Sequence, residues 1–124
     1  GFSSISPEYD RWLDAERGAL RSHSIGMLLR LADAYEAEKR FEEMISTSKT
    51  LLNLDSLQEH VHRRLMRAYR AQGRHDAALR QFENLREILL DQLGVEPEKP
   101  TLELFQAENA DAWGLQGYSS MILI

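Results

Sequence analysis

The chain has 124 residues, of which 43% are hydrophobic, 28% are charged and none is cysteine. A chain of this length supports one hydrophobic core, and the lack of cysteine excludes disulfides, thiolate catalysis and cysteine-ligated metal sites. The 20 acidic and 15 basic residues give a net charge of −5, which argues against a domain that coats nucleic acid by itself. Neither an apolar run of membrane-spanning length nor a signal segment is found, so we expect a cytoplasmic protein.

Residues 1–6 are predicted to form a flexible lead-in, and a first helix is expected from residue 7 to about residue 38. Ser6 followed by Pro7 is typical of a helix start, because a serine side chain caps free amides and proline fits the first turn. Apolar residues recur three and four positions apart, which predicts a core-facing stripe: Trp12, Ala15, Ala19, His23, Met27, Leu28, Leu31, Ala32 and Tyr35. The stretch forms either one long helix or two helices that meet near residues 22–24.

A second helix is expected over residues 40–53, and a third is expected to follow it and to end at Gly73. Ser56 and Glu59 have the spacing of a capping box for the third helix, in which a serine and a glutamate three residues later satisfy free amides. Gly73 is typical of the left-handed residue that ends a helix.

A fourth helix is expected over residues 75–93, ended by Gly94, and a fifth, shorter one from about residue 100. The fourth is predicted to place an apolar row inward: Ala78, Leu79, Phe82, Leu85, Leu89, Leu90 and Leu93. No stretch shows the alternation of apolar and polar residues that a sheet requires. The predicted fold is therefore all-α with about five helices.

The chain also contains an internal repeat of 34 residues. A shift by this length aligns Leu31 with Leu65, Tyr35 with Tyr69, Ala37 with Ala71, Arg40 with Arg74, Glu42 with Asp76 and Leu51 with Leu85. A period of 34 in helix–turn–helix units is that of the tetratricopeptide repeat. In the second unit, Gly73 stands at the turn and Ala78 at the position where the two helices of the unit come closest. The first unit has Lys39 and Met44 at the corresponding positions.

Several runs carry a more specific signal: residues 52–69 (LNLDSLQEHVHRRLMRAY), Gly73 with Arg74, residues 77–82 (AALRQF), residues 93–97 (LGVEP), and Trp12 with Glu16 and Arg17. Together they resemble the bacterial transcriptional activator domain, and we assign residues 7–108 to it. The resemblance implies a tetratricopeptide-like domain that stands C-terminal to a winged-helix DNA-binding domain, or inside signalling ATPases and cyclase-linked regulators. Ser56 departs from the family's usual proline. The sequence given shows no winged-helix segment before Trp12, so we expect none of the family's DNA contacts on this chain.

Basic residues gather on the predicted third helix. Residues 60–80 contain six arginines and one acid, which makes this segment +5 and the rest of the chain −10. The repeat predicts a groove, and its candidate partner-binding residues are His60, Arg63, Arg67, Arg70 and Arg74. Arginine binds carboxylates through a planar fork, so the expected ligand is an acidic peptide, a C-terminal carboxylate or an acidic protein face. Alternatively, Asp33 and Glu36 neutralise Arg67 and Arg70 across neighbouring helices, and contact with promoter DNA is at most auxiliary.

The residues favour a binding module over an enzyme, because no nucleophile, phosphate loop or distinctive carboxylate pair is found. His60 and His62 lie about 200° apart on a helix and cannot share a metal ion, so we expect neither metal nor cofactor. The predicted function is a protein-interaction and oligomerisation module of a bacterial transcriptional regulator that binds DNA through another domain. A peptide-binding adaptor that uses the arginine groove, and a regulatory segment of a signalling ATPase or cyclase, stay open as alternatives.

The C-terminal tail, residues 109–124, has one charged residue, Asp111, and ends in four apolar residues. An exposed apolar end favours aggregation. The tail therefore begins a further element, docks on the last helix, or inserts into the groove of a second copy and forms a homodimer.

Overall fold

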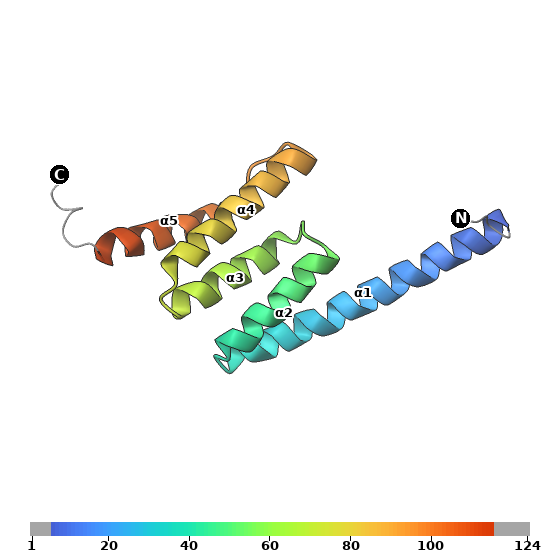
Figure 1. Ribbon diagram of the computed structural model, residues 1–124, viewed down its shortest axis with the longest axis horizontal. Coiled ribbons are helices and arrows are strands. Elements are labelled where there is room, and N and C mark those ends of the chain that lie inside the picture. Colours follow the sequence, from blue (N-terminus) through green and yellow to red (C-terminus); the bar gives the residue numbers. More distant parts are fainter. Residues whose placement is uncertain (1–5, 116–124) are drawn as a thin grey trace.

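The structure, a computed structural model, describes residues 6–115, and the side chains up to residue 110. This part of the chain consists of five α-helices joined by short connections (Figure 1): α1 (Pro7–Ala37), α2 (Phe41–Leu54), α3 (Glu59–Ala71), α4 (His75–Leu93) and α5 (Lys99–Leu115). The described residues form no strand, which confirms the predicted all-α class. Most of the predicted lead-in, residues 1–5, and the end of the predicted tail, residues 116–124, lie outside the described residues.

The first helix is a single long one. Its start follows the prediction, because the Ser6 hydroxyl accepts a hydrogen bond from the Tyr9 amide at 3.0 Å. It continues without interruption through residues 22–24, so the one-helix alternative is correct. The first half of α1 projects away from the other helices (Figure 1). None of the helices in the described range 6–115 has the length and apolar character to cross a membrane.

The helices pack in chain order, each against the next, and α5 also contacts α3. The main core lies between α2, α3, α4 and α5, where Met44, Leu65 and Phe82 are buried and the Phe105 ring stacks on Phe82 at 4.1 Å between ring centres. A second cluster joins Ala32, Leu51 and Val61 from the first three helices. The third helix is therefore the central element of the array.

The 34-residue repeat is present in the backbone of the two helix-joining turns. The Arg40 amide donates to the Tyr35 carbonyl at 2.9 Å, and the Arg74 amide donates to the Tyr69 carbonyl at 2.8 Å. Each pair closes the turn after the first helix of its unit. The two units thus share one turn geometry, as a tetratricopeptide-like fold requires.

The two positions at which the first unit departs from the repeat keep the geometry of the second. Lys39 has φ 58° and Gly73 has φ 75°, so both residues are left-handed. Met44 and Ala78 are both fully buried at the close helix approach. The first unit therefore has the same turn as the second, but with a side chain that is strained in this conformation.

Part of the predicted core stripe of α1 is wrong. Trp12, Met27 and Leu31 are 56%, 52% and 41% exposed, and Ala32 is the fully buried member of the stripe. Leu90 and Leu93 at the end of α4 are also exposed, at 44% and 55%. Apolar spacing identifies one face of a helix, but it does not determine whether another element covers that face.

The predicted capping box of the third helix is also wrong. The helix begins at Glu59, and its N-cap residue Gln58 makes no side-chain capping bond. The connection is instead closed by Asp55, whose Oδ1 accepts the Leu57 amide at 3.0 Å. Asp55 takes this role because its short carboxylate reaches the amide two residues on. Ser56 therefore lies within the connection, ahead of the N-cap residue.

The last helix is longer than expected. It runs from Lys99 to Leu115 and so continues past residue 108, the predicted domain boundary, into the first part of the predicted tail. The left-handed Gly94, with φ 66°, ends α4 as predicted.

Candidate functional site

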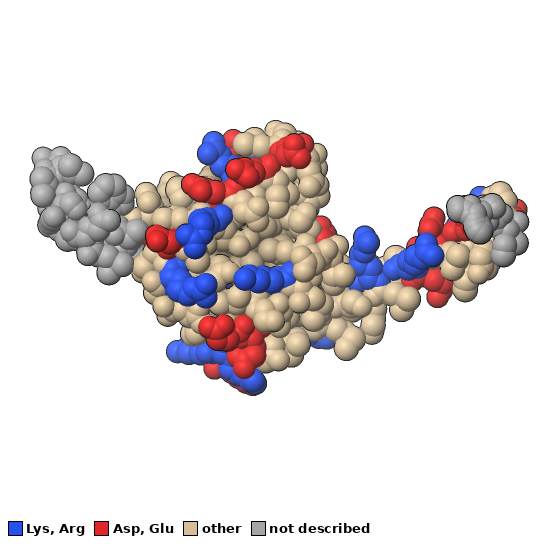
Figure 2. All heavy atoms as spheres, viewed as in Figure 1, with Lys and Arg blue, Asp and Glu red and all other residues tan. Residues whose placement is uncertain are grey.

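The predicted partner-binding residues lie on α3 and in the turn that follows it. Figure 2 shows basic side chains across the middle of one face of the helical body, with acidic side chains on either side of them. The hydrogen bonds described next pair much of this positive charge with acids of α1, α5 and the connection before α5. The acidic remainder of the chain therefore supplies counterions to its basic segment.

Two arginines of α3 reach α1. Arg67 forms a bidentate pair with Glu36, from Nε to Oε2 at 3.0 Å and from Nη2 to Oε1 at 3.1 Å. Arg64, whose side chain is 10% exposed, donates to Glu36 at 2.7 Å and forms a short ion pair with Asp33. The hydrogen bond from Arg67 lowers the pKa of Glu36 although partial burial opposes the shift. The predicted neutralisation of Arg67 by Glu36 is confirmed, whereas Asp33 pairs with Arg64.

Arg63 connects α3 with the start of α5. Its Nη1 donates to the Thr101 hydroxyl at 2.8 Å and to Glu98 Oε1 at 3.2 Å. The buried Thr101 hydroxyl donates to Glu59 Oε2 at 2.7 Å, and the same oxygen accepts the Glu98 amide at 2.6 Å. The Glu59 carboxylate thus lies at the N-terminus of α5, where negative charge is favourable. The glutamate predicted to cap the third helix stabilises the start of the fifth.

Arg70 also faces α5. Its Nε lies 3.7 Å from Oε1 of Glu108, a side chain that is only 1% exposed. The other carboxylate oxygen is in short hydrogen-bond contact with Nδ1 of His75. A carboxylate this deeply buried requires such partners. The predicted pairing of Arg70 with an acid of α1 is therefore replaced by pairing with Glu108.

Arg74 lies in the turn between α3 and α4. Its guanidinium carbon is 4.7 Å from the centre of the Tyr69 ring, and its Nη1 donates to Gln72 Oε1 at 3.2 Å. Cation–π contacts of this kind fix the orientation of an arginine at a surface. Arg74, the last of the predicted partner-binding residues, therefore belongs to the repeated turn.

The two neighbouring histidines have different environments. His60 is exposed, and partial desolvation, followed by the positive charges of Arg63 and Arg64, lowers its pKa. His62 is fully buried, with Nε2 donating to the Ser56 carbonyl at 2.9 Å and Nδ1 accepting from Gln81 at 2.8 Å, a tautomer assigned from this network. Burial lowers the pKa of His62, which keeps it neutral at pH 7. Among the described side chains, no group of three or more metal-ligating residues is positioned to hold an ion.

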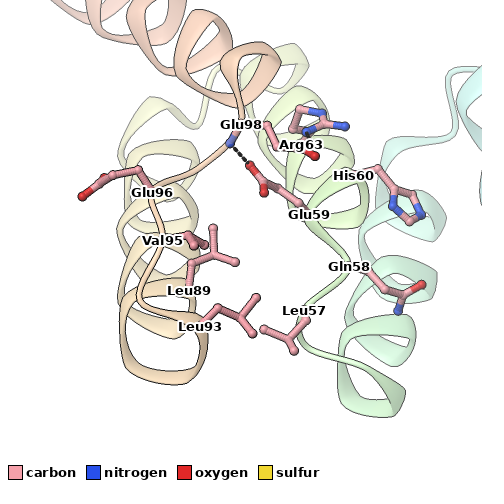
Figure 3. A pocket seen from close by; sticks show the side chains of 10 residues that line it. All are labelled: Leu57, Gln58, Glu59, His60, Arg63, Leu89, Leu93, Val95, Glu96 and Glu98. Carbon is pink, nitrogen blue, oxygen red and sulfur yellow. Dashed lines mark hydrogen bonds and ion pairs between the residues drawn. The ribbon is translucent and has the colours of Figure 1, made fainter.

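A hollow of about 410 Å³ lies between the start of α3 and the connection from α4 to α5 (Figure 3). Its apolar lining consists of Leu57, Leu89, Leu93 and Val95, and its polar lining of Gln58, Glu59, His60, Arg63, Glu96 and Glu98. Leu93 and Val95 are 55% and 46% exposed. Two of the five predicted partner-binding residues, His60 and Arg63, line this hollow, while Arg67, Arg70 and Arg74 lie elsewhere on the molecule.

Sequence reasoning missed Arg64, Glu59 and Glu108 as members of this network. Glu36 lies 28 residues before Arg64 and 31 before Arg67, and Glu59 lies 42 before Thr101. These separations share no constant value, so the 34-residue period could not predict the contacts. The available signal was the charge distribution, because a segment of +5 attracts the acids of a chain whose remainder is −10.

Comparison with known proteins identifies one family. The family model of the bacterial transcriptional activator domain matches residues 3–107, most of the chain. The matched range includes α1 to α4, the first half of α5 and every residue of the predicted partner-binding row. Neither a curated protein nor a solved structure matches the chain. The resemblance seen in the sequence is thereby confirmed.

Proposed function

Because the chain belongs to the family of bacterial transcriptional activator domains, we propose that it is a protein-interaction module of a bacterial transcriptional regulator whose DNA-binding domain is a separate unit. The proposed role is binding, without catalysis, in the cytoplasm. The proposed partner is a component of the transcription machinery or another domain of the same regulator.

The observation that carries this proposal is the hollow beside α3. Leu93 and Val95 expose apolar surface next to the charged side chains of Arg63, Glu96 and Glu98. An apolar pocket with a polar rim is the usual form of a protein-binding hot spot, because an inserted side chain is desolvated there and the rim fixes its orientation. We therefore place partner binding at this hollow, with His60 and Arg63 at its rim.

The pairing of the arginines favours a protein partner over DNA. Arg63, Arg64 and Arg67 donate to carboxylates of the chain itself, so phosphate contacts would have to replace these internal bonds. Nucleic-acid binding draws its affinity from cations that release counterions when they meet phosphates. The same competition disfavours the adaptor alternative, in which the arginine row clamps an acidic peptide.

The proposal is tested in the full-length regulator with Leu93→Glu. Leu93 is half-exposed, so the variant should fold, and the added charge should prevent an apolar side chain from entering the hollow. We expect activation of a reporter promoter to fall by about tenfold, the loss expected for one hot-spot residue, while binding of promoter DNA in a gel-shift assay stays unchanged.

Leu90→Glu is the matched control, because Leu90 is similarly exposed one turn earlier on α4 and does not line the hollow. Full activation by Leu93→Glu, or an equal loss in both variants, would contradict the proposed site.

A further inference from the structure

An apolar row lies on the exposed side of α1. It consists of Tyr9, Leu13, Leu20, Met27 and Leu31, of which Leu20 is 65% exposed and Met27 52%. At 100° per residue these five side chains fall within about 40° of one another. The packed side of the helix, with Leu28 and Ala32, faces a different direction. The row is thus distinct from the surface that holds α1 on the body.

The spacing of this row is symmetric about Leu20. Leu13 and Met27 lie seven residues before and after it, and Tyr9 and Leu31 lie eleven before and after. An antiparallel second copy of the helix therefore places Leu20 on Leu20, Leu13 on Met27 and Tyr9 on Leu31. A two-fold axis at Leu20 generates all of these contacts at once, as an isologous dimer requires.

The charges along α1 favour the same arrangement. Residues 8–16 contain four acids and one arginine, a charge of −3, whereas residues 17–30 contain three arginines and no acid, a charge of +3. Figure 2 shows charged side chains of both signs along this projecting part of the molecule. An antiparallel pair centred on Leu20 places residues 8–16 of each copy against residues 24–32 of the other, where Arg30 lies beside the acidic segment, while a parallel pair brings each acidic segment against its own counterpart.

We propose that two copies of this chain associate through an antiparallel pairing of their α1 helices, centred on Leu20. The paired stretch from Tyr9 to Leu31 is about 33 Å long at 1.5 Å per residue. Its five apolar side chains gain burial that the single chain does not provide. Helices α2 to α5 of both copies remain accessible in this dimer, because the face of α1 that packs on the rest of the chain is turned away from the row. This inference goes beyond the proposed function, because the row on α1 is separate from the hollow beside α3.

Mass measurement by sedimentation velocity, over a concentration series of the full chain, provides the first test. We expect the wild-type chain to form a dimer and Leu20→Glu to stay monomeric at every concentration, because two carboxylates would meet at the two-fold axis. Ser22→Glu adds the same charge about 160° away on the helix and should dimerise like the wild type. Circular dichroism should show equal helix content in all three, since both positions are exposed.

Cysteine cross-linking provides the second test, and the chain has no native cysteine to interfere. Leu20→Cys should oxidise to a covalent dimer with itself, and a mixture of Leu13→Cys with Met27→Cys should give a mixed dimer. Leu13→Cys alone should not cross-link, because the two-fold axis places its copies far apart.

A monomeric wild-type chain, dissociation by Ser22→Glu, or self-cross-linking of Leu13→Cys would overturn the inference. If the row instead packs against another domain of the regulator, the wild-type chain should be monomeric and Leu20→Glu should not change its mass. Failure of the proposed function is a separate outcome, because the Leu93→Glu variant tests activation and should leave the dimer intact.

Discussion

In the turn between α3 and α4, the guanidinium of Arg74 lies over the ring of Tyr69, 4.7 Å from its centre. The same contact occurs 34 residues earlier, where Arg40 lies 4.9 Å from the centre of the Tyr35 ring. Each arginine amide also donates to the carbonyl of the tyrosine it covers. The aligned tyrosine and arginine of each unit thus make the same interactions. The residue directly before the arginine differs, because it is Lys39 in the first turn and Gly73 in the second.

This difference predicts opposite effects of two substitutions. Lys39 has φ 58°, a conformation that places its Cβ against the backbone, so Lys39→Gly should raise the free energy of unfolding by about 0.5–1 kcal/mol. Gly73→Lys should lower it by about 1 kcal/mol for the same reason. No atom lies within 4 Å of a Cβ built at Gly73, so the effect there comes from the backbone alone. Urea denaturation measures both, and a loss of stability in Lys39→Gly would show that its side chain contributes more than the strain removes.

The helices and their repeat could be predicted because they depend on local spacing and on a fixed period. Ala78 and Phe82 were correctly predicted as core residues, since α4 is covered by its neighbours. Trp12 was not, because the spacing that makes a helix amphipathic is the same whether its apolar face meets the body or another molecule.

The candidate site was predictable only in part. The arginine row follows from helical spacing, but each arginine's partner depends on how successive helices are displaced along one another. Arg67 reaches Glu36 and Arg63 reaches Thr101, on opposite neighbours of α3. The hollow lined by Leu57 and Val95 is formed by two connections, whose course apolar periodicity does not specify.

The pairing of Glu36 with two arginines should stabilise the fold. Glu36→Gln removes the charge that holds Arg64 and Arg67, and it should lower the free energy of unfolding by about 1–2 kcal/mol, because hydrogen bonds between charged groups are lost at a partly buried position. Glu43→Gln is the control, since Glu43 pairs with Arg40 at 3.1 Å while both side chains are about half exposed. Its stability should be unchanged within error. Equal losses in both variants would contradict a special role for Glu36.

The stabilisation by Glu36 should also disappear in acid. The hydrogen bond from Arg67 lowers the pKa of Glu36 below its ordinary value of 4.5. The unfolded chain then binds a proton at Glu36 more readily than the folded chain does. The contribution of Glu36 to the free energy of unfolding is therefore complete above pH 4.5, and it is lost as the pH falls through the lowered pKa of the folded chain. The difference in unfolding free energy between wild type and Glu36→Gln should therefore shrink below pH 4.5. A difference that stays constant down to pH 3 would exclude the carboxylate as its source.

His62 should make the fold less stable in mildly acidic solution. Its ring is fully buried, and desolvation lowers its pKa below the ordinary value of 6.5. The unfolded chain binds a proton that the folded chain excludes, so stability is complete above pH 6.5 and declines as the pH falls towards the lowered value, by at most about 1.4 kcal/mol per pH unit. His62→Gln should flatten this part of the curve. His60→Gln is the comparison, because the pKa of His60 is lowered as well although the side chain is exposed. A larger flattening in His60→Gln than in His62→Gln would contradict the role given to His62.

The projecting half of α1 should respond to helix propensity more strongly than the rest of the fold. Gly18 lies in its interior, exposed, with open space around the position of a Cβ, so Gly18→Ala should stabilise the local helix by about 0.5–1 kcal/mol. In the monomeric Leu20→Glu background, hydrogen exchange of amides 10–20 should slow several-fold, while exchange in α3 stays the same, because few contacts within the chain support this segment. Gly94→Ala provides the contrast. Its φ of 66° is left-handed, so the same substitution should destabilise the end of α4. Unchanged exchange in this monomeric background would mean that helix propensity does not limit the opening of this half of the helix.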